Sequence, residues 1–379
     1  SYTTLFRSTQ LLNGLPGWHT SRRIVVIESD DWGSIRMPDK ATYDLLLSRG
    51  IRVDNCPYNR YDSLASEKDL SALFEVLASF RDFRGNHPVL TANCVVANPD
   101  FKKIRESGFT AYHYEKFTDT LMRFPDRSGS FRLWMEGLER NLFHPEFHGR
   151  EHLNVMRWMD ALAGGMPETM LAFDHGLFGL SMHITSERRK SYLQAFDVHD
   201  HRDTDKVRTI IAEGTGLFRQ ILGYPARSFI APNYTWPLQI EPDLAGLGVR
   251  YLKGGIIQNA PVQGTSENRK IRHFTGQRNR HGQIHIERTC EFEPSLFPGK
   301  DSVDECMKQV SQAFRMNKPA VITSHRVNYI GSIVESNRDN TLRLLRTLLG
   351  SIQQRWPEVE FMTAESLGDL IDKKPKKNI

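Results

Sequence analysis

Two hydrophobic periods alternate along the chain, and their alternation separates predicted strands from predicted helices. Short runs rich in β-branched and aromatic residues recur, with stretches of helical spacing between them. In the first run, residues 24–27 read IVVI, and such continuous apolarity is typical of a strand covered on both faces. The pattern predicts βα units and a largely parallel sheet. The predicted strands are 22–28, 88–97, 226–232, 248–254, 283–289, 319–325 and 359–364.

The clearest helical spacing covers residues 204–222, where apolar residues recur every three or four positions. Thr204 is expected to cap this helix at its start, and Gly223 is expected to end it. Two further apolar stripes, in 303–314 and 342–356, predict two more helices. We assign all three apolar faces to the core and expect no chemistry from them.

The domain organisation follows from the spacing of these elements. The stretches 34–87 and 154–225 are long for simple crossovers and carry helical patterns of their own. We expect them to be insertions that cover a site, and not unstructured loops. A length of 379 residues fits one large α/β barrel or two ordinary domains. We predict a single catalytic domain over 1–379 that contains both insertions.

Composition and charge narrow the class of protein. The chain is 39% apolar and 25% charged, which is typical of a globular protein, and no run approaches the roughly 20 apolar residues of a membrane span. The first residues lack a charged region followed by a long apolar one, so we expect a cytoplasmic protein; a leader removed upstream would leave no trace. The net charge of +5 is spread along the chain except for KKPKK at 373–377, so we expect no nucleic-acid partner.

Cysteine usage adds one further expectation. The four cysteines show no CxxC pair and no zinc-finger spacing, so reduced and mostly structural thiols are predicted. They are Cys56, Cys94, Cys290 and Cys306.

The first predicted strand ends in two adjacent carboxylates. Residues 28–33 read ESDDWG, which places Asp30 and Asp31 side by side after the apolar run. Neighbouring carboxylates repel each other and are costly to desolvate. The pair therefore indicates a bound cation, a shared proton or simple solvation.

Three histidines at four-residue intervals lie in HPEFHGREHLN, namely His144, His148 and His152. Two imidazoles on one zinc need nitrogens within about 4 Å, whereas four residues of extended strand span about 13 Å. Gly149 indicates a turn or a helix start, which would bring His148 and His152 together. Two histidines, one carboxylate and an open position make a catalytic divalent-metal site. Solvated surface histidines are the alternative, and the spacing alone leaves His144 open as a ligand.

A further histidine, His325 in VITSHRVN, ends a predicted apolar strand, as the aspartates do. In α/β barrels, catalytic groups gather at the carboxyl ends of the strands. An ordinary hydrogen-bonded histidine is the alternative.

The order of these motifs resembles the NodB-homology polysaccharide deacetylases, carbohydrate esterase family 4, whose motifs read T-F-D-D-G, H-[ST]-x-x-H, R-x-P-Y and L-x-L-H. The resemblance implies a distorted (β/α)7-type barrel with mostly parallel strands, here with helical insertions, and a divalent metal ion that is usually zinc. It implies that Asp30 is the catalytic base and His325 the catalytic acid. It implies further that Asp31, His148 and His152 hold the metal, since a leucine follows His152 much as in the family.

The sequence also departs from the family's motifs. Trp32 stands where the family runs directly from aspartate to glycine, and it is either an aromatic sugar platform or a buried packing residue. IAPNYTW at 230–236 carries Ile230 or Ala231 where the family has the arginine that steers its base. Arg36 or Arg326 could substitute for that arginine, or either could be a surface ion-pair residue.

The same loop supplies further candidate substrate contacts. Asn233, Tyr234 and Trp236 follow the proline, and they either bind substrate or form a turn.

The prediction from the resemblance is a metal-dependent hydrolase that removes an N- or O-linked acetyl group from a carbohydrate, with a metal-bound water attacking the acyl carbonyl. Its partner would be an acetylated sugar or polysaccharide; no feature indicates an oligomeric state. One alternative is a glycosidase that uses Asp30 with Glu291 or Glu293. Another is a catalytically inactive carbohydrate-binding descendant of the same fold, which the missing arginine makes credible.

Overall fold

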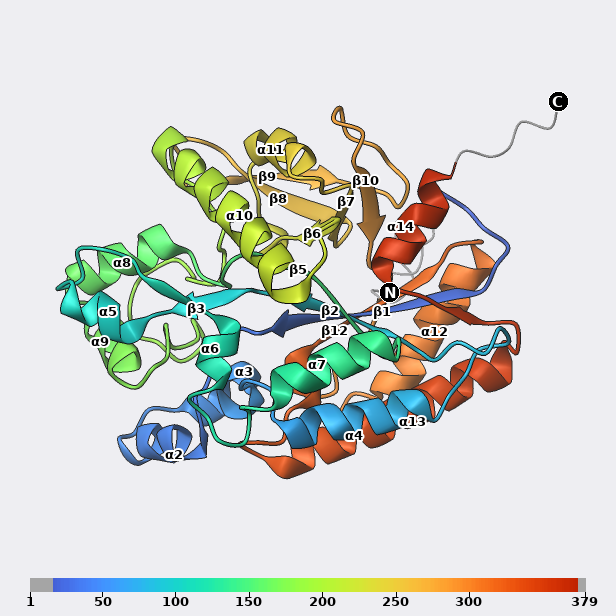
Figure 1. Ribbon diagram of the computed structural model, residues 1–379, viewed down its shortest axis with the longest axis horizontal. Helices are drawn as coiled ribbons and strands as arrows, with labels where there is room; N and C mark the ends of the chain where they lie inside the picture. Colours follow the sequence, from blue (N-terminus) through green and yellow to red (C-terminus); the bar gives the residue numbers. More distant parts are fainter. Residues whose placement is uncertain (1–15, 374–379) are drawn as a thin grey trace, which may run out of the picture.

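The main sheet is parallel and curved, and helices surround it (Figure 1). The computed structural model describes residues 16–373. Hydrogen-bonded neighbours follow the order β10-β7-β6-β5-β2-β1-β12-β11, and β13 pairs with β1. The strands are β1 (Ile24–Trp32), β2 (Leu90–Cys94), β5 (Phe143–Phe147), β6 (Ser228–Ile230), β7 (Tyr251–Gly254), β10 (Ile284–Glu287), β11 (Cys290–Glu291), β12 (Ala320–His325) and β13 (Glu360–Phe361).

One bent segment closes this sheet into a barrel. Strand β10 pairs with β7, β11 pairs with β12, and only Arg288 and Thr289 lie between β10 and β11. The amide of Arg288 donates to the carbonyl of Gly254 at 2.9 Å, and that of Thr289 donates to Val321 at 2.9 Å. Residues 284–291 therefore act as one strand that passes from one neighbour to the other. The predicted fold class, an α/β barrel of (β/α)7 type with mostly parallel strands, is confirmed.

Each of the seven predicted runs contains a strand of this sheet, but the sequence missed β5. Its residues FHPEF place Pro145 in a central strand, where a missing N–H normally argues against strand structure. His144 and Glu146 also interrupt its apolar pattern. Two antiparallel hairpins lie outside the main sheet, formed by β3 (Ala97–Pro99) with β4 (Tyr114–Lys116) and by β8 (Ile257–Pro261) with β9 (Asn268–Arg272).

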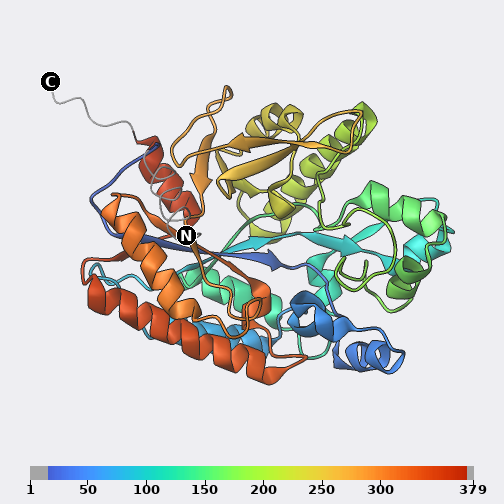
Figure 2. The same ribbon diagram turned by 180° about the vertical axis from the view of Figure 1, so that it is seen from behind.

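Long helices pack against the outside of the barrel (Figures 1 and 2). The three predicted helices are present as α10 (His201–Leu222), α12 (Ser302–Arg315) and α13 (Glu335–Arg355). Gly223 ends α10 at φ 83°, as predicted, but Asp200 and not Thr204 caps its start. The others are α2 (Lys40–Ser48), α3 (Pro57–Tyr61), α4 (Glu67–Ala78), α5 (Phe101–Glu106), α6 (Phe117–Leu121), α7 (Ser130–Glu139), α8 (Val155–Ala163), α9 (Pro167–Asp174), α11 (Glu241–Gly246) and α14 (Ala364–Asp372).

The two long stretches differ from simple loops. Helices α2 and α3 of 34–87 and α8 and α9 of 154–225 lie at the end of the barrel toward which the strands point (Figures 1 and 2). Helices α4 and α10 belong to the same stretches, but they pack along the barrel as ordinary crossovers. The parts at the barrel end are therefore shorter than the predicted insertions.

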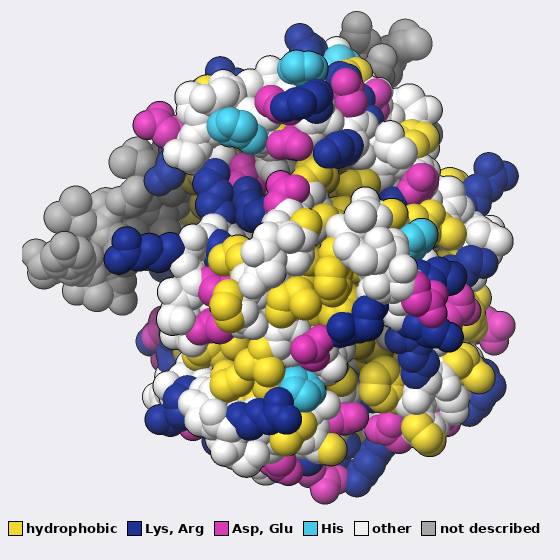
Figure 3. Space-filling model, turned by 90° about the vertical axis from the view of Figure 1, so that its left-hand side faces the viewer, with side chains coloured by type: hydrophobic (Ala, Val, Ile, Leu, Met, Phe, Trp, Pro, Cys, Tyr) yellow, Lys and Arg dark blue, Asp and Glu magenta, His cyan; other side chains and the backbone are white. Residues whose placement is uncertain are grey.

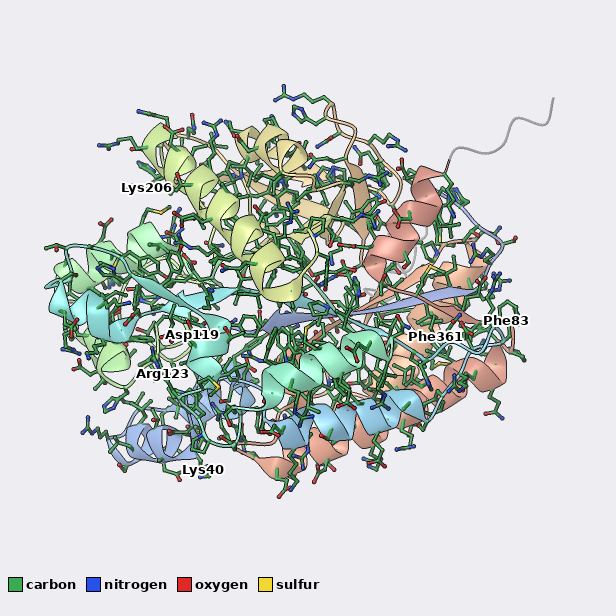
Figure 4. The ribbon with its side chains drawn as sticks, viewed as in Figure 1. Lys40, Phe83, Asp119, Arg123, Lys206 and Phe361 are labelled. Atoms are coloured by element: carbon green, nitrogen blue, oxygen red, sulfur yellow. The ribbon has the colours of Figure 1, made fainter. Side chains whose placement is uncertain are left out.

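Alternation along β1 separates two cores. Val25 and Ile27 face the large apolar core between the strands and the helices. Ile24 and Val26 face the barrel interior, where they pack with Leu367 of α14 at the amino ends of the strands. The next residue on the inner face is charged, so the interior changes from apolar to polar toward the carboxyl ends. Side chains fill the space between the elements (Figure 4).

Two remaining expectations concern composition. All four cysteines are free, in line with the expected reduced thiols, and all four are buried. Within residues 16–373, no helix is long and apolar enough to cross a membrane. Most of the KKPKK block, and the first fifteen residues, lie outside the described part of the chain.

Candidate active site

A break in the regularity of β1 brings both aspartates to the same site. The pairing of β1 with β2 shifts register between Ser29 and Trp32, and Asp31 has φ 74°. In a regular strand, adjacent side chains point to opposite faces, whereas a bulge re-aims one of them. Asp30 therefore continues the inner face of the barrel, and Asp31 also reaches its carboxyl end.

Asp31, His148 and His152 form a compact group of ligand atoms. One atom from each side chain lies within 4.8 Å of the others. Asp31 Oδ1 is 3.7 Å from His148 Nε2 and 3.1 Å from His152 Nε2. Gly149, at φ 120°, makes the turn that lets His152 return toward His148 at the end of β5. The expected turn at this glycine is present.

The chemistry of this group fits a divalent ion. His148 Nδ1 donates to the carbonyl of Ile230 at 2.8 Å, which leaves the lone pair on Nε2 for a ligand. That Nε2 atom is buried and has no hydrogen-bond partner. Burial lowers the pKa of His152 to about 4, so this ring is neutral near pH 7, as ligation requires. Two nitrogens and one oxygen are a donor set typical of catalytic zinc.

The remaining histidine of the motif lies elsewhere. His144 is on β5, with its ring stacked on Tyr224 at 5.6 Å and its Nε2 4.0 Å from Glu365. Both neighbours lie toward the amino ends of the strands, and four residues of strand separate His144 from His148 by about 13 Å. His144 therefore does not join the group, which resolves the alternative that the spacing left open.

Asp30 is held by Arg288, which no sequence motif marks. Arg288 donates to Asp30 Oδ1 at 2.5 Å and to Oδ2 at 2.8 Å, and the guanidinium is almost fully buried. Burial alone would raise the pKa of Asp30, but Arg288 outweighs it and holds that pKa well below its ordinary value. The carboxylate therefore remains ionised at neutral pH.

The two arginines proposed as substitutes have other partners, so both proposals are corrected. Arg36 donates to Asp31 Oδ2 at 3.0 Å and thus orients the candidate metal ligand and not the base. Arg326 is fully buried, donates to both oxygens of Asp62 and cannot reach solvent or substrate. Arg288 was missed because it lies at the bend of a strand, where no short motif marks it.

His325 lies opposite Asp30 across the site. Its Nε2 is 3.9 Å from Asp30 Oδ2, and its Nδ1 donates to Glu293 Oε1 at 2.6 Å. Burial works against the charged ring, but Glu293 and the aspartates raise the pKa of His325 to about 9. Glu293 is itself fixed by Asn328 at 2.7 Å. His325 therefore carries a proton at neutral pH and keeps a quarter of its side chain exposed.

Glu293 and Glu291 bear on the glycosidase alternative. Glu293 is committed to His325 and Asn328, and Glu291 pairs with Lys300 at 3.2 Å. Both carboxylates that were considered as partners of Asp30 are thus engaged by other groups.

Of the predicted aromatic substrate contacts, Trp32 and Trp236 are buried, whereas Tyr234 lies beside the candidate base. Trp32 is buried, donates to Ser29 Oγ at 2.9 Å and packs against Phe143, so it is a packing residue and not a sugar platform. Trp236 is also buried, with its ring stacked on His273, because its loop turns into the hairpin. The Tyr234 hydroxyl oxygen accepts a hydrogen bond from Arg288 at 3.2 Å.

Asn233, by contrast, is exposed on the loop after β6 and has φ 55°. Its side chain remains a candidate substrate contact.

Both inserted segments meet over Arg36. The Arg36 guanidinium lies 5.5 Å from the ring centre of Tyr58 and 5.5 Å from that of Phe178. Tyr58 also meets the His325 ring edge-on at 5.7 Å. A cavity of about 50 Å³ lies between these segments and is lined by all three of Arg36, Tyr58 and Phe178. Figure 3 views this end of the barrel, where apolar side chains lie among Lys and Arg side chains.

None of the protein-family models matches the sequence, and no curated protein is significantly similar to it. Its fold is similar to several solved structures. A structure titled as a polysaccharide deacetylase from Mycobacterium smegmatis is 10% identical, with 94% of this chain and 92% of that chain covered and a TM-score of 0.44. A CE4 family pseudoenzyme from Bacillus anthracis is 9% identical, covering 93% and 67%, with a TM-score of 0.40.

A third similar structure is a different kind of enzyme. The 4-alpha-glucanotransferase from Thermococcus litoralis is 10% identical, covering 94% of this chain and 41% of that chain, with a TM-score of 0.46. The similar structures thus include polysaccharide deacetylases and CE4 proteins. At TM-scores below 0.5, these likenesses identify neither the reaction nor the substrate of this chain.

Proposed function

We propose that the chain is a metal-dependent hydrolase that removes an acetyl group, N- or O-linked, from a carbohydrate. The observation that carries the proposal is one juxtaposition: the ligand atoms of Asp31, His148 and His152 lie within 4.8 Å of one another, beside Asp30 and His325. A divalent ion bound there, most simply zinc, would polarise the acyl carbonyl and lower the pKa of a water.

The chain's own groups supply the proton transfers. Asp30 is ionised, and its Oδ2 atom faces His325, so it can accept a proton from the attacking water. His325 is protonated near neutral pH, and it can give its Nε2 proton to the departing amine or hydroxyl. Arg288 and Glu293 hold the base and the acid in these opposite states of charge.

The carbohydrate part of the proposal rests on the resemblance of the sequence motifs. Both partners of the proton transfer and all three ligand positions match those motifs residue by residue. The arginine does not match, and Arg288 meets the same carboxylate from another strand.

The test is metal analysis of the purified protein together with acetate release from a panel of N- and O-acetylated sugars. Wild type is expected to bind one divalent ion and to release acetate, Asp30→Asn to bind the ion without turnover, and His148→Ala to lose both. Acetate release that survives both substitutions would contradict the proposal. Sugar binding without acetate release in metal-loaded wild type would indicate the inactive descendant instead.

A further inference from the structure

The middle layer of the barrel interior is charged. Interiors of α/β barrels are ordinarily filled by branched apolar side chains, and here the layer at the amino ends of the strands follows that rule. Two residues further along the strands, the inner face of the barrel carries buried polar groups directly below the candidate base Asp30. They come from four strands and from the bend between β10 and β11: Glu28, Asn93, Glu146, Lys253 and Arg288.

Lys253 is the centre of this layer and has no exposed side-chain surface. Its ammonium donates to Glu146 Oε2 at 2.5 Å and to the side-chain oxygen of Asn93, and it lies 3.6 Å from Glu28 Oε2. Ser228 donates to the same oxygen of Glu146 at 2.6 Å. Glu146 therefore fixes the position of Lys253, and Lys253 faces Asn93.

The contact with Lys253 decides which way the Asn93 amide points. An ammonium has only protons to donate, so the Asn93 oxygen must face it and the Nδ2 group must face the opposite way. Nδ2 then donates to Asp30 Oδ1 at 2.7 Å and to Glu28 Oε2 at 3.1 Å. With the amide reversed, the Asn93 oxygen would meet two carboxylates.

The bonds to Asp30 are therefore unequal. Oδ1 accepts from both Asn93 and Arg288, whereas Oδ2 accepts from Arg288 and is the oxygen nearest to His325. We propose that Asn93 and Lys253 are positioning residues of the reaction: Lys253 sets the orientation of Asn93, and Asn93 pins one oxygen of Asp30 so that the other is presented to the water. This inference rests on the proposed function.

A purely structural role does not account for this layer. Apolar residues of similar volume commonly replace a buried ion pair without loss of stability, so the pair Lys253–Glu146 is not needed to hold a barrel together. The charges of this layer lie directly beneath Asp30, whereas the layer below them is mostly apolar, with His144 and Glu365 as its polar members.

The experiment compares Asn93→Leu, Lys253→Met and the double variant Lys253→Met/Glu146→Gln with wild type. Partners in the second layer of a site typically contribute 10–100-fold to activity, so each variant is expected to lose about 10–100-fold in kcat with KM little changed. Bound metal should remain equimolar, because none of these residues touches Asp31, His148 or His152. In crystals of Asn93→Leu, the Asp30 carboxylate is expected to turn from its present position.

The double variant separates positioning from stability. Lys253→Met leaves Glu146 buried without its counter-ion, so it is expected to lower the melting temperature and, in the extreme case, not to fold. Neutralising Glu146 as well should restore the melting temperature, but it should not restore kcat, because no donor faces the Asn93 oxygen. Recovery of kcat together with stability would overturn the proposal, as would wild-type kcat in Asn93→Leu with Asp30 unmoved.

The control variant is Arg338→Met, which removes a buried arginine that binds Asp69 at 3.1 Å and lies on α13. It is expected to lower the melting temperature without changing kcat.

The outcome for wild type distinguishes this inference from the proposed function. Metal-loaded wild type without acetate release would remove the proposed function, whereas an active wild type with fully active Asn93→Leu and double variants would remove the positioning inference alone.

Discussion

The two sides of the candidate site are built in different ways. The metal side consists of Asp31 and two histidines four residues apart, on short segments that a bulge and a glycine turn bring together. The base side consists of Asp30 and the side chains that hold it, which come from strands far apart in the sequence. Only the first of these sides has a signature that can be found within a few residues.

This difference shows which contacts of the site can be supplied from another position in the sequence. A metal ligand must place one atom at a fixed distance and angle, so its position in a motif is restricted. An arginine that neutralises a carboxylate can approach from any neighbouring strand that ends at the same edge. Here Arg288 approaches from the bent strand that closes the barrel, and the loop after β6, which carries no arginine, supplies only the Tyr234 hydroxyl.

Removing a residue of the metal side should have the largest effect. His148→Ala is expected to lose the bound ion and to lower kcat/KM on the order of 1,000-fold or more, because the ion supplies several kcal/mol of transition-state stabilisation. Metal analysis and acetate release measure the two losses. A variant that keeps the ion and the activity would place the metal elsewhere.

Removing the arginine of the base side should have a smaller effect on activity and a larger one on stability. Arg288→Met leaves Asp30 buried without its counter-ion and Glu28 with Lys253 alone, which should cost about 3–5 kcal/mol of unfolding free energy. The pKa of Asp30 should rise, so the acidic limb of the kcat/KM profile should move to higher pH, with a loss of about 100-fold near neutrality. Denaturant unfolding and pH profiles test these effects.

Retention of bound ion in Arg288→Met would show that the two sides are separable. Loss of the ion would contradict that separation, since Arg288 contacts no residue of the metal group.

His325, the proposed acid, should determine the alkaline limb of the pH–activity profile. Activity is expected to fall as the pH rises through about 9, and somewhat earlier with the ion bound, because a nearby cation lowers the pKa of His325. Glu293→Gln should lower this pKa and move the limb toward neutral pH. A limb that stays in place in Glu293→Gln would argue that another group gives the proton.

The protonation of His325 also affects the stability of the fold. Its pKa in the folded state is raised above the ordinary value of about 6.5. The stabilisation that protonated His325 gives the folded state is therefore complete below pH 6.5, and it is lost as the pH rises toward 9. Thermal unfolding of wild type and Glu293→Gln across this range measures it.

The smallest effect is expected at the remaining histidine of the motif. His144→Ala should leave metal content and kcat unchanged, because its ring lies about 13 Å along the strand from His148. Loss of its stacking on Tyr224 should cost only about 1 kcal/mol. A lost ion in this variant would contradict the assignment of the ligand pair.

Much of the fold was predictable from periodicity, because buried parallel strands and amphipathic helices leave local patterns. The missed strand β5 shows the limit: Pro145, His144 and Glu146 hide a central strand because its inner face is polar. The metal group was predictable because its residues, like those of the helices, form a pattern within a short stretch of sequence.

The support of Asp30 was not predictable in this way. Lys253 and Asn93 lie 160 positions apart and meet only through the order of the strands. Glu28 and Glu146, polar residues two positions before Asp30 and His148, were the signal available. Without the strand order, that signal does not say which of them meet.

The bent strand that closes the barrel also has a consequence for folding. Residues 284–291 join β7 to β12, and the cation that neutralises Asp30 sits at the bend. Opening this seam would therefore withdraw the Arg288 cation from Asp30 and leave Asp31, His148 and His152 in place. Closure of the barrel and the charge balance of the candidate base are thus coupled through one short segment.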